Sequence, residues 1–285
     1  MSEGVAFPSL NRPSDEDGQS TGSASADIRE IAAGLFARHE AASLSPSLWQ
    51  DREEPAFEFK FQVDQTKARD LATWAAEHLN LDPHADPQLE NSYRVHGLYF
   101  DTPFLDVYHR SPGFKKRKFR LRRYGEGATI FLEQKRKSAG RVAKRRVPIG
   151  EGDLARLREP YAEVEWPGVW FHRRISQRQL QPSCLISYCR QAYFGHNAEG
   201  PLRMTLDRQV RAGDANGWSI ATLADGGPTL TEQVLLELKF RRHLPALFKA
   251  LMQDFALTPG PLSKYRLAIQ SLGRANLGAG GGPDA

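Results

Sequence analysis

The chain has 285 residues and a formal net charge of +5, with 39 Lys and Arg against 34 Asp and Glu. This length suits one large domain with a substantial core. The two cysteines, Cys184 and Cys189, fall on opposite faces of an expected strand, so we expect no disulfide and a reducing compartment. The sequence has neither an apolar run of about 18 residues nor a signal-peptide pattern, which predicts a cytoplasmic protein without a membrane span.

Three regions are expected along the chain: an N-terminal extension at 1–55, a folded domain at 56–272 and a flexible tail at 273–285. Residues 1 to about 25 are rich in Ser, Gly, Asp and Pro, which predicts disorder. A short helix with Asp27 as its cap is expected at 27–42, and a linker is expected at 46–55.

The domain is expected to begin with a strand at 57–61, whose aromatic residues face one side while Glu58 and Lys60 face the other. The same alternation of charged and apolar residues recurs in later segments. Further strands are expected at 93–101, 118–123, 130–135, 142–149, 184–194, 202–210 and 233–240. Helices are expected at 66–79, 152–159, 244–255 and 263–272, while 169–181 fits either class.

Positive charge is concentrated in residues 115–146, which contain fourteen Lys or Arg and two acidic residues. In the first strand of this segment Lys118, Arg120 and Arg122 share one face. The next two strands each place further charged residues on one face, namely Glu133 and Lys135, then Lys144 and Arg146. Because rows of like charge on adjacent strands repel one another, the sequence predicts that a polyanion lies between them.

This alternating charge also predicts the fold class. Most of the eight expected strands have charged residues on one face and apolar residues on the other. If the sheet closes on itself, the charged faces line an interior and helices cover the apolar outside. We therefore predict an α+β fold, an eight-stranded antiparallel β-barrel that forms a tunnel with a charged interior and helices packed outside. An open antiparallel sheet with its charged face in water is the alternative.

The charged residues suit phosphate chemistry. The two common Gly-rich phosphate-binding loops are missing from the sequence, and Arg and Lys side chains offer donors to phosphate oxygens in their place. Three carboxylates are predicted to share the cationic face and would suit Mn²⁺ or Mg²⁺, namely Glu58, Glu133 and Glu237. The alternative for these carboxylates is an ion pair within or between strands, with Lys60, Lys135 or Lys239.

Nine short motifs follow one another within residues 55–272. They are Glu58-x-Lys60, Leu98-Tyr99-Phe100-Asp101, Arg120-x-Arg122-x-Tyr124-Gly125, Phe131-Leu132-Glu133-x-Lys135, Lys144-x-Arg146, Tyr188-x-Arg190, Arg203-x-Thr205-x-Asp207, Glu237-x-Lys239 and Ser263-Lys264-Tyr265. Their order resembles the VTC domain, the polyphosphate polymerase domain of the triphosphate tunnel metalloenzyme (CYTH-like) superfamily. The resemblance implies an eight-stranded antiparallel tunnel.

The resemblance also implies roles for individual residues. Catalytic contacts to nucleotide or polyphosphate oxygens would come from Lys60, Arg120, Arg122, Lys135, Lys144 and Arg190, with Lys264 as a further substrate contact. Glu237 would hold the metal, and Glu58 resembles a first-strand carboxylate that other tunnel enzymes use for metal. Further substrate-binding residues are expected on the same cationic faces, namely Lys118, Arg146, Arg203 and Lys239.

The expected activity is metal-dependent transfer of the γ-phosphate of ATP to a growing polyphosphate or pyrophosphate acceptor, with no DNA partner. Two alternatives remain open. One is a tunnel-type tripolyphosphatase or nucleoside triphosphatase, and the other is a polyphosphate- or nucleic-acid-binding module without turnover. Eukaryotic members of the family add an SPX domain and membrane helices. Residues 1–55 are too short for the former and no membrane helix is found, so a stand-alone domain of bacterial type is expected.

Overall fold

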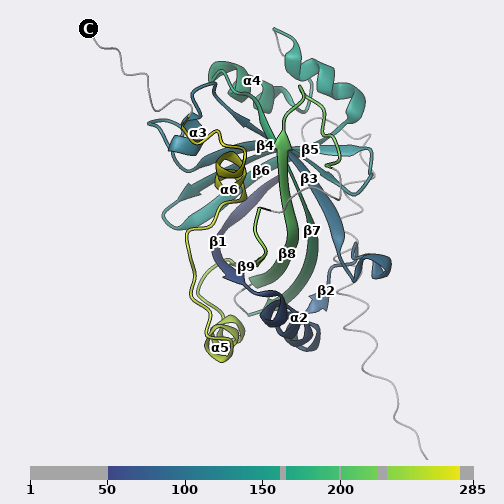
Figure 1. The fold of residues 1–285 in the computed structure, drawn as a ribbon, viewed down its shortest axis with the longest axis vertical. Coiled ribbons are helices and arrows are strands. Elements are labelled where there is room, and N and C mark those ends of the chain that lie inside the picture. The colour runs from purple at the N-terminus through teal and green to yellow at the C-terminus, as the bar shows by residue number, and fades with distance from the viewer. Residues whose placement is uncertain (1–50, 161–164, 199, 224–229, 277–285) are drawn as a thin grey trace, which may run out of the picture. The chain divides into compact units, whose positions relative to one another are not determined.

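The computed structural model describes residues 51–160, 165–198, 200–223 and 230–276 (Figure 1). The strands are β1 (Asp51–Val63), β2 (Asn80–Leu81), β3 (Tyr93–Asp101), β4 (Arg117–Tyr124), β5 (Thr129–Ser138), β6 (Arg141–Gly150), β7 (Gln181–Asn197), β8 (Gly200–Asp214) and β9 (Val234–Phe240). The helices are α2 (Gln65–His78), η2 (Pro87–Leu89), α3 (Asp106–His109), η3 (Glu151–Arg158), α4 (Val169–Gln177), α5 (Ala246–Asp254) and α6 (Lys264–Ser271), of which η2 and η3 are 3-10 helices. The disorder expected up to residue 25 and the helix expected at 27–42 lie outside the described residues.

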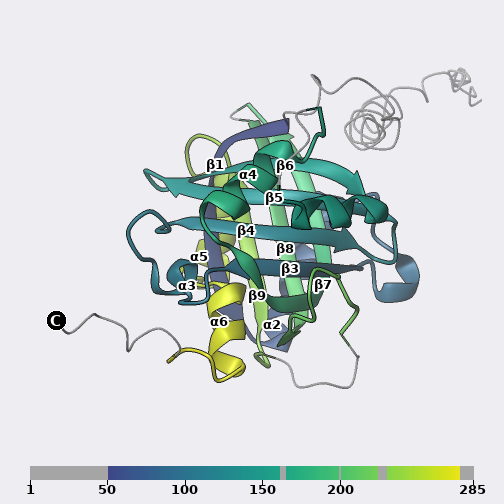
Figure 2. The ribbon, with the colours of Figure 1, turned by 90° about the horizontal axis from the view of Figure 1, so that it is seen from above.

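Eight of the strands close into an antiparallel barrel. In order of pairing they are β7, β3, β4, β5, β6, β1, β9 and β8, and β8 pairs again with β7. The short strand β2 pairs with the C-terminal part of β7. Figure 2 shows β3, β4, β5 and β6 side by side on one wall of the barrel. The predicted eight-stranded antiparallel barrel is therefore confirmed, and the open sheet is excluded.

Strand register brings the charged residues to the inner face. Arg120 on β4 lies opposite Glu133 on β5, which lies opposite Arg146 on β6. On the other wall Lys60 on β1 lies opposite Glu237 on β9. Since side chains alternate between the faces of a strand, the apolar residues between these positions face outward.

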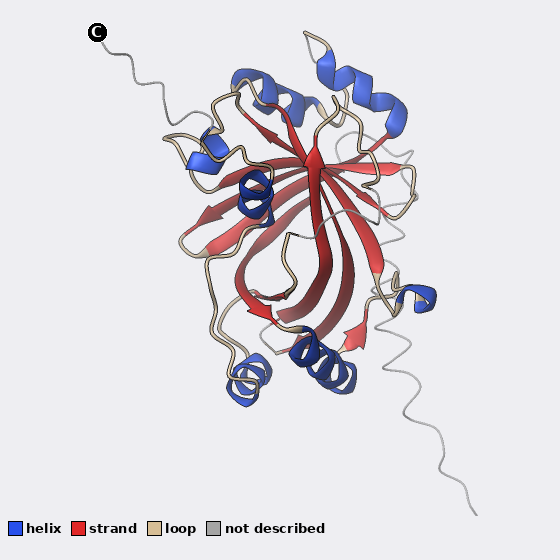
Figure 3. Ribbon diagram, in the orientation of Figure 1, coloured by secondary structure: helices blue, strands red, loops and turns tan. Residues whose placement is uncertain are grey.

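Helices cover the apolar outer face (Figure 3). Leu71 of α2 and Phe248 of α5 pack in one cluster with Phe61 of β1 and Leu238 of β9. On the wall formed by β3 and β4, Phe171 of α4 packs against Phe100 and Phe119. Burial of each such side chain stabilises the fold by about 1.5–3 kcal/mol, so the outer clusters hold the strands in place around a polar interior. None of the helices in the described part of the chain is long and apolar enough to cross a membrane.

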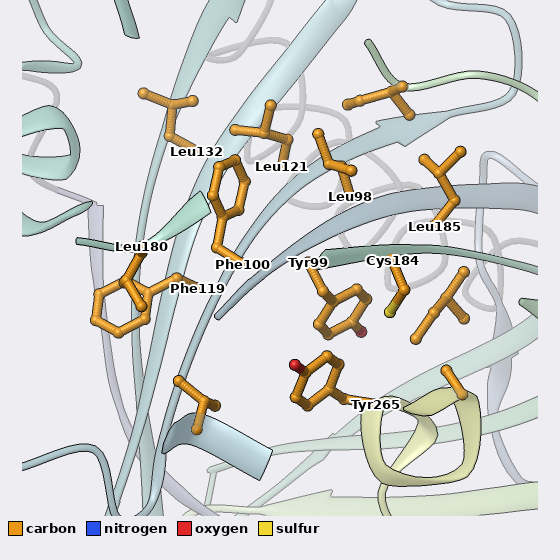
Figure 4. Close-up of a cluster of buried hydrophobic side chains, with 14 of the residues drawn as sticks. Leu98, Tyr99, Phe100, Phe119, Leu121, Leu132, Leu180, Cys184, Leu185 and Tyr265 are labelled. Atoms are coloured by element: carbon orange, nitrogen blue, oxygen red, sulfur yellow. The ribbon is translucent and has the colours of Figure 1, made fainter. Parts of the chain in front are cut away.

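Helix α6 differs from the other helices because its side chains reach the inner face of the barrel. Tyr265 stacks on Tyr99 of β3, with ring centroids 5.5 Å apart and planes 9° apart (Figure 4). The Tyr265 hydroxyl donates to Asp101 Oδ2 at 2.6 Å. Ser263 caps the helix by accepting from Arg266 N. The helix therefore lies against the inner side of β3, where it can contribute residues to the tunnel.

The linker prediction for 46–55 is wrong for its described end, because β1 begins at Asp51. The start of β1 forms backbone hydrogen bonds with β6 in antiparallel pairing. The register shifts between Glu53 and Ala56, which places Pro55 at a β-bulge, one of the few positions in a sheet that tolerate proline. The sequence pattern around Pro55 does not show this bulge. The two cysteines are free thiols, as predicted.

Candidate functional site

The first cluster in the tunnel consists of Arg120 and Arg122 from β4 and Glu133 from β5. Nε and Nη2 of Arg120 lie 2.7 and 2.6 Å from Glu133 Oε2. Nε of Arg122 lies 3.9 Å from the same oxygen. Arg120 also donates to the Tyr99 hydroxyl, and Arg122 donates to the Tyr188 hydroxyl, each at 2.9 Å. Because two guanidinium groups share one carboxylate, the cluster keeps a net positive charge.

Glu133 lies beneath these arginines, and its side chain is 0% exposed. Burial opposes ionisation, but the charges of Arg120 and Arg122 hold the pKa of Glu133 well below its usual range. Its other oxygen, Oε1, is buried and accepts no hydrogen bond from the described residues. These are the contacts of an anion that orients two arginines. The role of Glu133 as a metal ligand stays a prediction.

The second cluster joins two strands to helix α6. Arg190 of β7 forms two hydrogen bonds with Asp207 of β8, at 2.7 Å from Nε to Oδ1 and 2.8 Å from Nη2 to Oδ2. Lys264 Nζ of α6 lies 2.5 Å from Asp207 Oδ2. Both cations also lie over the ring of Tyr188. Two cations again share one carboxylate, so this cluster is also positive.

The third cluster contains two of the predicted metal ligands. Lys60 Nζ lies 2.9 Å from Glu237 Oε2 and 3.4 Å from Glu58 Oε2. Lys135 Nζ lies 3.0 Å from Glu58 Oε1. Burial and the charge of Glu237 raise the pKa of Glu58, but Lys135 and Lys60 outweigh them and lower it. Burial also opposes the charge of Glu237, and Lys60 holds its pKa well below the usual range. Both carboxylates are therefore anionic.

Lys118 lies at the edge of the third cluster. Its Nζ donates to the Ser263 hydroxyl at 2.8 Å, which links β4 to the start of α6. Burial and the charges of Lys60 and Lys135 lower the pKa of Lys118 well below its usual value. Its charged form is therefore disfavoured unless an anion enters the tunnel.

The four other predicted cations lie on the inner faces of β6, β8 and β9. Arg146 lies over the Phe131 ring, with its guanidinium carbon 3.8 Å from the centroid, and Lys144 lies opposite Lys135 in the register. Arg203 lies opposite Lys239. Nη2 of Arg203 lies 3.2 Å from both Asp82 Oδ2 and the Tyr93 hydroxyl. Its side chain is 40% exposed, so it lies nearer to solvent than the arginines of the first two clusters.

The carboxylates of the third cluster fit a divalent metal only in part. Glu58 and Glu237 offer hard oxygen donors on one side of the tunnel, and both approach Lys60 Nζ. The described residues contain no group of three or more His, Cys, Asp or Glu side chains that could hold a metal ion. Mg²⁺ commonly uses one or two carboxylates and completes its shell with water and substrate phosphates. The residues therefore fit a metal that binds together with a phosphate substrate.

Asp207 is a central residue that the sequence-based site prediction missed. It accepts from both Arg190 and Lys264 and its side chain is 0% exposed. The hydroxyls of Tyr99 and Tyr188 were likewise not predicted as partners of the arginines. The alternation in Arg203-x-Thr205-x-Asp207 could have placed Asp207 on the charged face of its strand. No sequence pattern could show which cation it meets.

The fold and the site together define a closed antiparallel tunnel lined by cations and by carboxylates that orient them. A model of the VTC domain family matches residues 56–273. The chain therefore belongs to the VTC domain family, as the motif resemblance indicated. No curated protein sequence matches this chain at a significant level.

Several solved structures resemble the chain at low sequence identity. One is a predicted adenylate cyclase from Bacillus halodurans, with 15% identity, a TM-score of 0.47 and coverage of 77% of this chain and 97% of that chain. Another is a predicted adenylyl cyclase from Hippeastrum described as having a dominant triphosphatase activity, with 15% identity, a TM-score of 0.43 and coverage of 77% and 96%. A third, a predicted adenylate cyclase from Vibrio parahaemolyticus, has 14% identity, a TM-score of 0.42 and coverage of 75% and 97%.

Proposed function

We propose that the protein is a metal-dependent polyphosphate polymerase that transfers the γ-phosphate of ATP to a growing polyphosphate chain. The observation that carries this proposal is the excess of positive charge inside a closed barrel. The three clusters hold six Lys and Arg with four carboxylates. Five further Lys and Arg, namely Lys118, Lys144, Arg146, Arg203 and Lys239, lie on the inner strand faces. A linear polyanion neutralises such an excess along the whole tunnel, whereas a single small anion neutralises only part of it.

The reaction needs no protein nucleophile. A terminal phosphate oxygen of the acceptor attacks the γ-phosphorus of ATP, and a new phosphoanhydride bond forms. The bond between the γ-phosphorus and its bridging oxygen breaks, and ADP leaves with that oxygen. Negative charge spreads over the oxygens of the transferred group. Arg120 and Arg122, fixed in place by Glu133, would supply oriented donors to those oxygens with little reorganisation.

The third cluster would position the phosphates on the opposite side. Glu237 and Glu58 would hold Mn²⁺ or Mg²⁺, which supplies neutralisation of phosphate charge when it is bound. Lys60 and Lys135 already pair with these carboxylates. They would therefore be available to contact phosphate oxygens that bind beside these carboxylates.

Hydrolysis of a triphosphate or nucleoside triphosphate is the second candidate, because the same cationic tunnel would hold a triphosphate substrate equally well. Water would then attack the terminal phosphorus in place of an acceptor phosphate, and orthophosphate would be released without chain growth. The products therefore distinguish the two reactions.

One experiment tests the proposal against both alternatives. The purified protein is incubated with ATP and Mn²⁺ or Mg²⁺, with and without pyrophosphate, and the products are followed by phosphorus NMR. ADP together with internal phosphoanhydride signals is the expected result. Orthophosphate without chain growth would assign the hydrolase. Tight polyphosphate binding with no ADP would assign a binding module and contradict the polymerase.

A further inference from the structure

A second cationic feature lies outside the three clusters of the tunnel. A groove of about 360 Å³ lies where β4 begins and β5 ends, and it is lined by Lys115, Lys116, Arg117, Arg136 and Lys137 together with Gly113 and Ser138. We call it the outer basic groove. Figure 2 shows the two strands side by side. The tunnel clusters do not use any of these residues.

The positive charges of the outer basic groove are crowded together. Arg117 lies directly opposite Arg136 in the strand register. Burial and the guanidinium charges of Arg178, Arg136 and Arg174 lower the pKa of Arg117, so the arginines at the C-terminal end of α4 also lie close by. Like charges at directly opposed positions destabilise a sheet. An anion in the groove would remove this repulsion.

The groove has no acidic partner within the described structure. The ion pairs found there involve none of its five cations and neither Arg174 nor Arg178. This distinguishes it from the tunnel, where Glu133, Asp207 and Glu58 neutralise part of the charge. The side chains of Lys115, Lys116, Arg136 and Lys137 are exposed. They are therefore accessible to a ligand in solution.

The backbone holds the rim of the groove in a defined shape. Lys116 adopts the left-handed conformation, with φ of 62°, which is uncommon for a residue other than glycine. Lys137 N donates to Lys116 O at 2.9 Å. This bond extends the β4–β5 pairing by one residue before the start of β4, so the lysines lie on a fixed turn.

The groove adjoins the tunnel along the chain. Arg117 directly precedes Lys118, whose ammonium group is buried near Lys60 and Lys135. Lys137 follows Lys135 by two residues, so both side chains leave the same face of β5. The inner row of positive charge therefore continues along β5 from Lys135 to Lys137, whereas Arg117 and Arg136 leave the outer face of the same two strands.

We propose that the outer basic groove binds the part of an inorganic polyphosphate chain that lies outside the tunnel. The identity of this ligand rests on the proposed function. The lining residues favour polyphosphate over RNA, because all of their charged side chains are cations and none offers an aromatic ring on which a base could stack. A chain bound at both places would be held by the tunnel and the groove together, which raises its affinity above that of a short chain.

The test compares two variants that lose the same charge. Arg117→Gln with Arg136→Gln removes two groove cations, and Arg242→Gln with Lys249→Gln removes two exposed cations at and near α5. The affinities for long-chain polyphosphate and for tripolyphosphate are measured at several salt concentrations. We expect the groove variant to bind long chains about tenfold more weakly, with a log–log salt slope smaller by about 1.4. Its affinity for tripolyphosphate, and both affinities of the control variant, should stay unchanged.

Other binding results would overturn the proposal. An unchanged long-chain affinity would show that the groove holds no chain, and an equal loss for tripolyphosphate would show that the substitutions act through the tunnel. If the wild type binds RNA more tightly than polyphosphate of equal charge, and the groove variant loses this RNA binding, the ligand of the groove is nucleic acid and not polyphosphate. Should this variant fail to fold, Lys116→Gln with Lys137→Gln makes the same test on exposed side chains. If the groove variant loses only long-chain affinity and the wild type makes no chain from ATP, the groove proposal stands and only the proposed polymerase activity is contradicted.

Discussion

The guanidinium group of Arg190 meets the carboxylate of Asp207 in a two-point contact at 2.7 and 2.8 Å, across the strand pair that closes the barrel. Lys264 of α6 reaches the same carboxylate. One residue pair therefore serves two purposes. It links β7 to β8 at the point of closure, and it holds two cations in positions that face the tunnel.

Asp207→Asn should destabilise the protein, because it leaves Arg190 and Lys264 without their counter-charge in a buried place. The expected loss in the free energy of unfolding is about 3 kcal/mol, measured by urea denaturation at neutral pH. Asp254→Asn, at the exposed end of α5, is the matched control and should stay within about 0.5 kcal/mol of the wild type. Equal stability of the two variants would contradict the buried ion pair.

The Arg190–Asp207 pair also predicts how the free energy of unfolding depends on pH. Burial opposes the charge of Asp207, but Arg190 and Lys264 lower its pKa to about 2. Because the folded pKa is below the unfolded one, the contribution is complete above the unfolded value of about 3.9. It is lost as the pH falls through about 2. The wild type should therefore lose stability relative to Asp207→Asn over this interval, which denaturation curves in acid can check.

Tyr124 should ionise near neutral pH. Burial raises the pKa of the Tyr124 phenol, but nearby positive charges, Arg122 foremost, lower it further, to about 7. A phenolate absorption that appears near this pH, and is missing in Tyr124→Phe, is the expected observation. Since this folded pKa is below the unfolded value of about 10, the stability of the wild type relative to Tyr124→Phe should rise between them. Polyphosphate should raise the pKa of the phenol, because two anions repel. An absorption unaffected by the substitution would contradict this prediction.

Glu237→Gln should reduce turnover by about a hundredfold or more, because it removes a predicted metal ligand and the counter-charge of Lys60. The amide keeps the shape of the side chain, so thermal unfolding should still show a folded protein. A higher Mn²⁺ or Mg²⁺ concentration for half-maximal activity would identify weakened metal binding as the cause. Glu77→Gln, on the exposed side of α2, is the matched control, and equal activity in both variants would remove Glu237 from the site.

Tyr265→Phe tests the attachment of α6. It removes the hydrogen bonds of the hydroxyl to Asp101 at 2.6 Å and to Ser183 at 3.2 Å, and it leaves the stacking on Tyr99. The free energy of unfolding should fall by about 1–2 kcal/mol, and hydrogen exchange of the α6 amides should become faster. Tyr108→Phe, whose ring is buried beside α6, serves as the control and should keep α6 protected. Equal exchange rates in all three proteins would show that these bonds do not hold the helix.

The sequence determined which side chains share a face. Strict alternation placed Lys118, Arg120 and Arg122 together and assigned the opposite face to apolar residues, because successive side chains of any strand point to opposite sides. The same rule predicted a charged interior and an apolar exterior, and the structure confirms both. Motif order then identified the family.

Only the tertiary structure decided which charges meet. Residues two apart on one strand are about 6.6 Å apart, whereas directly opposite residues on neighbouring strands are about 5 Å apart. Glu133 therefore pairs with Arg120, Asp207 with Arg190 and Glu237 with Lys60, each across a strand boundary. Those partners lie 13 to 177 residues apart in the chain, so local pattern carries no information about them. Closure of β8 onto β7 and the entry of Lys264 from α6 depend on packing of the whole barrel, which fixes every one of these distances.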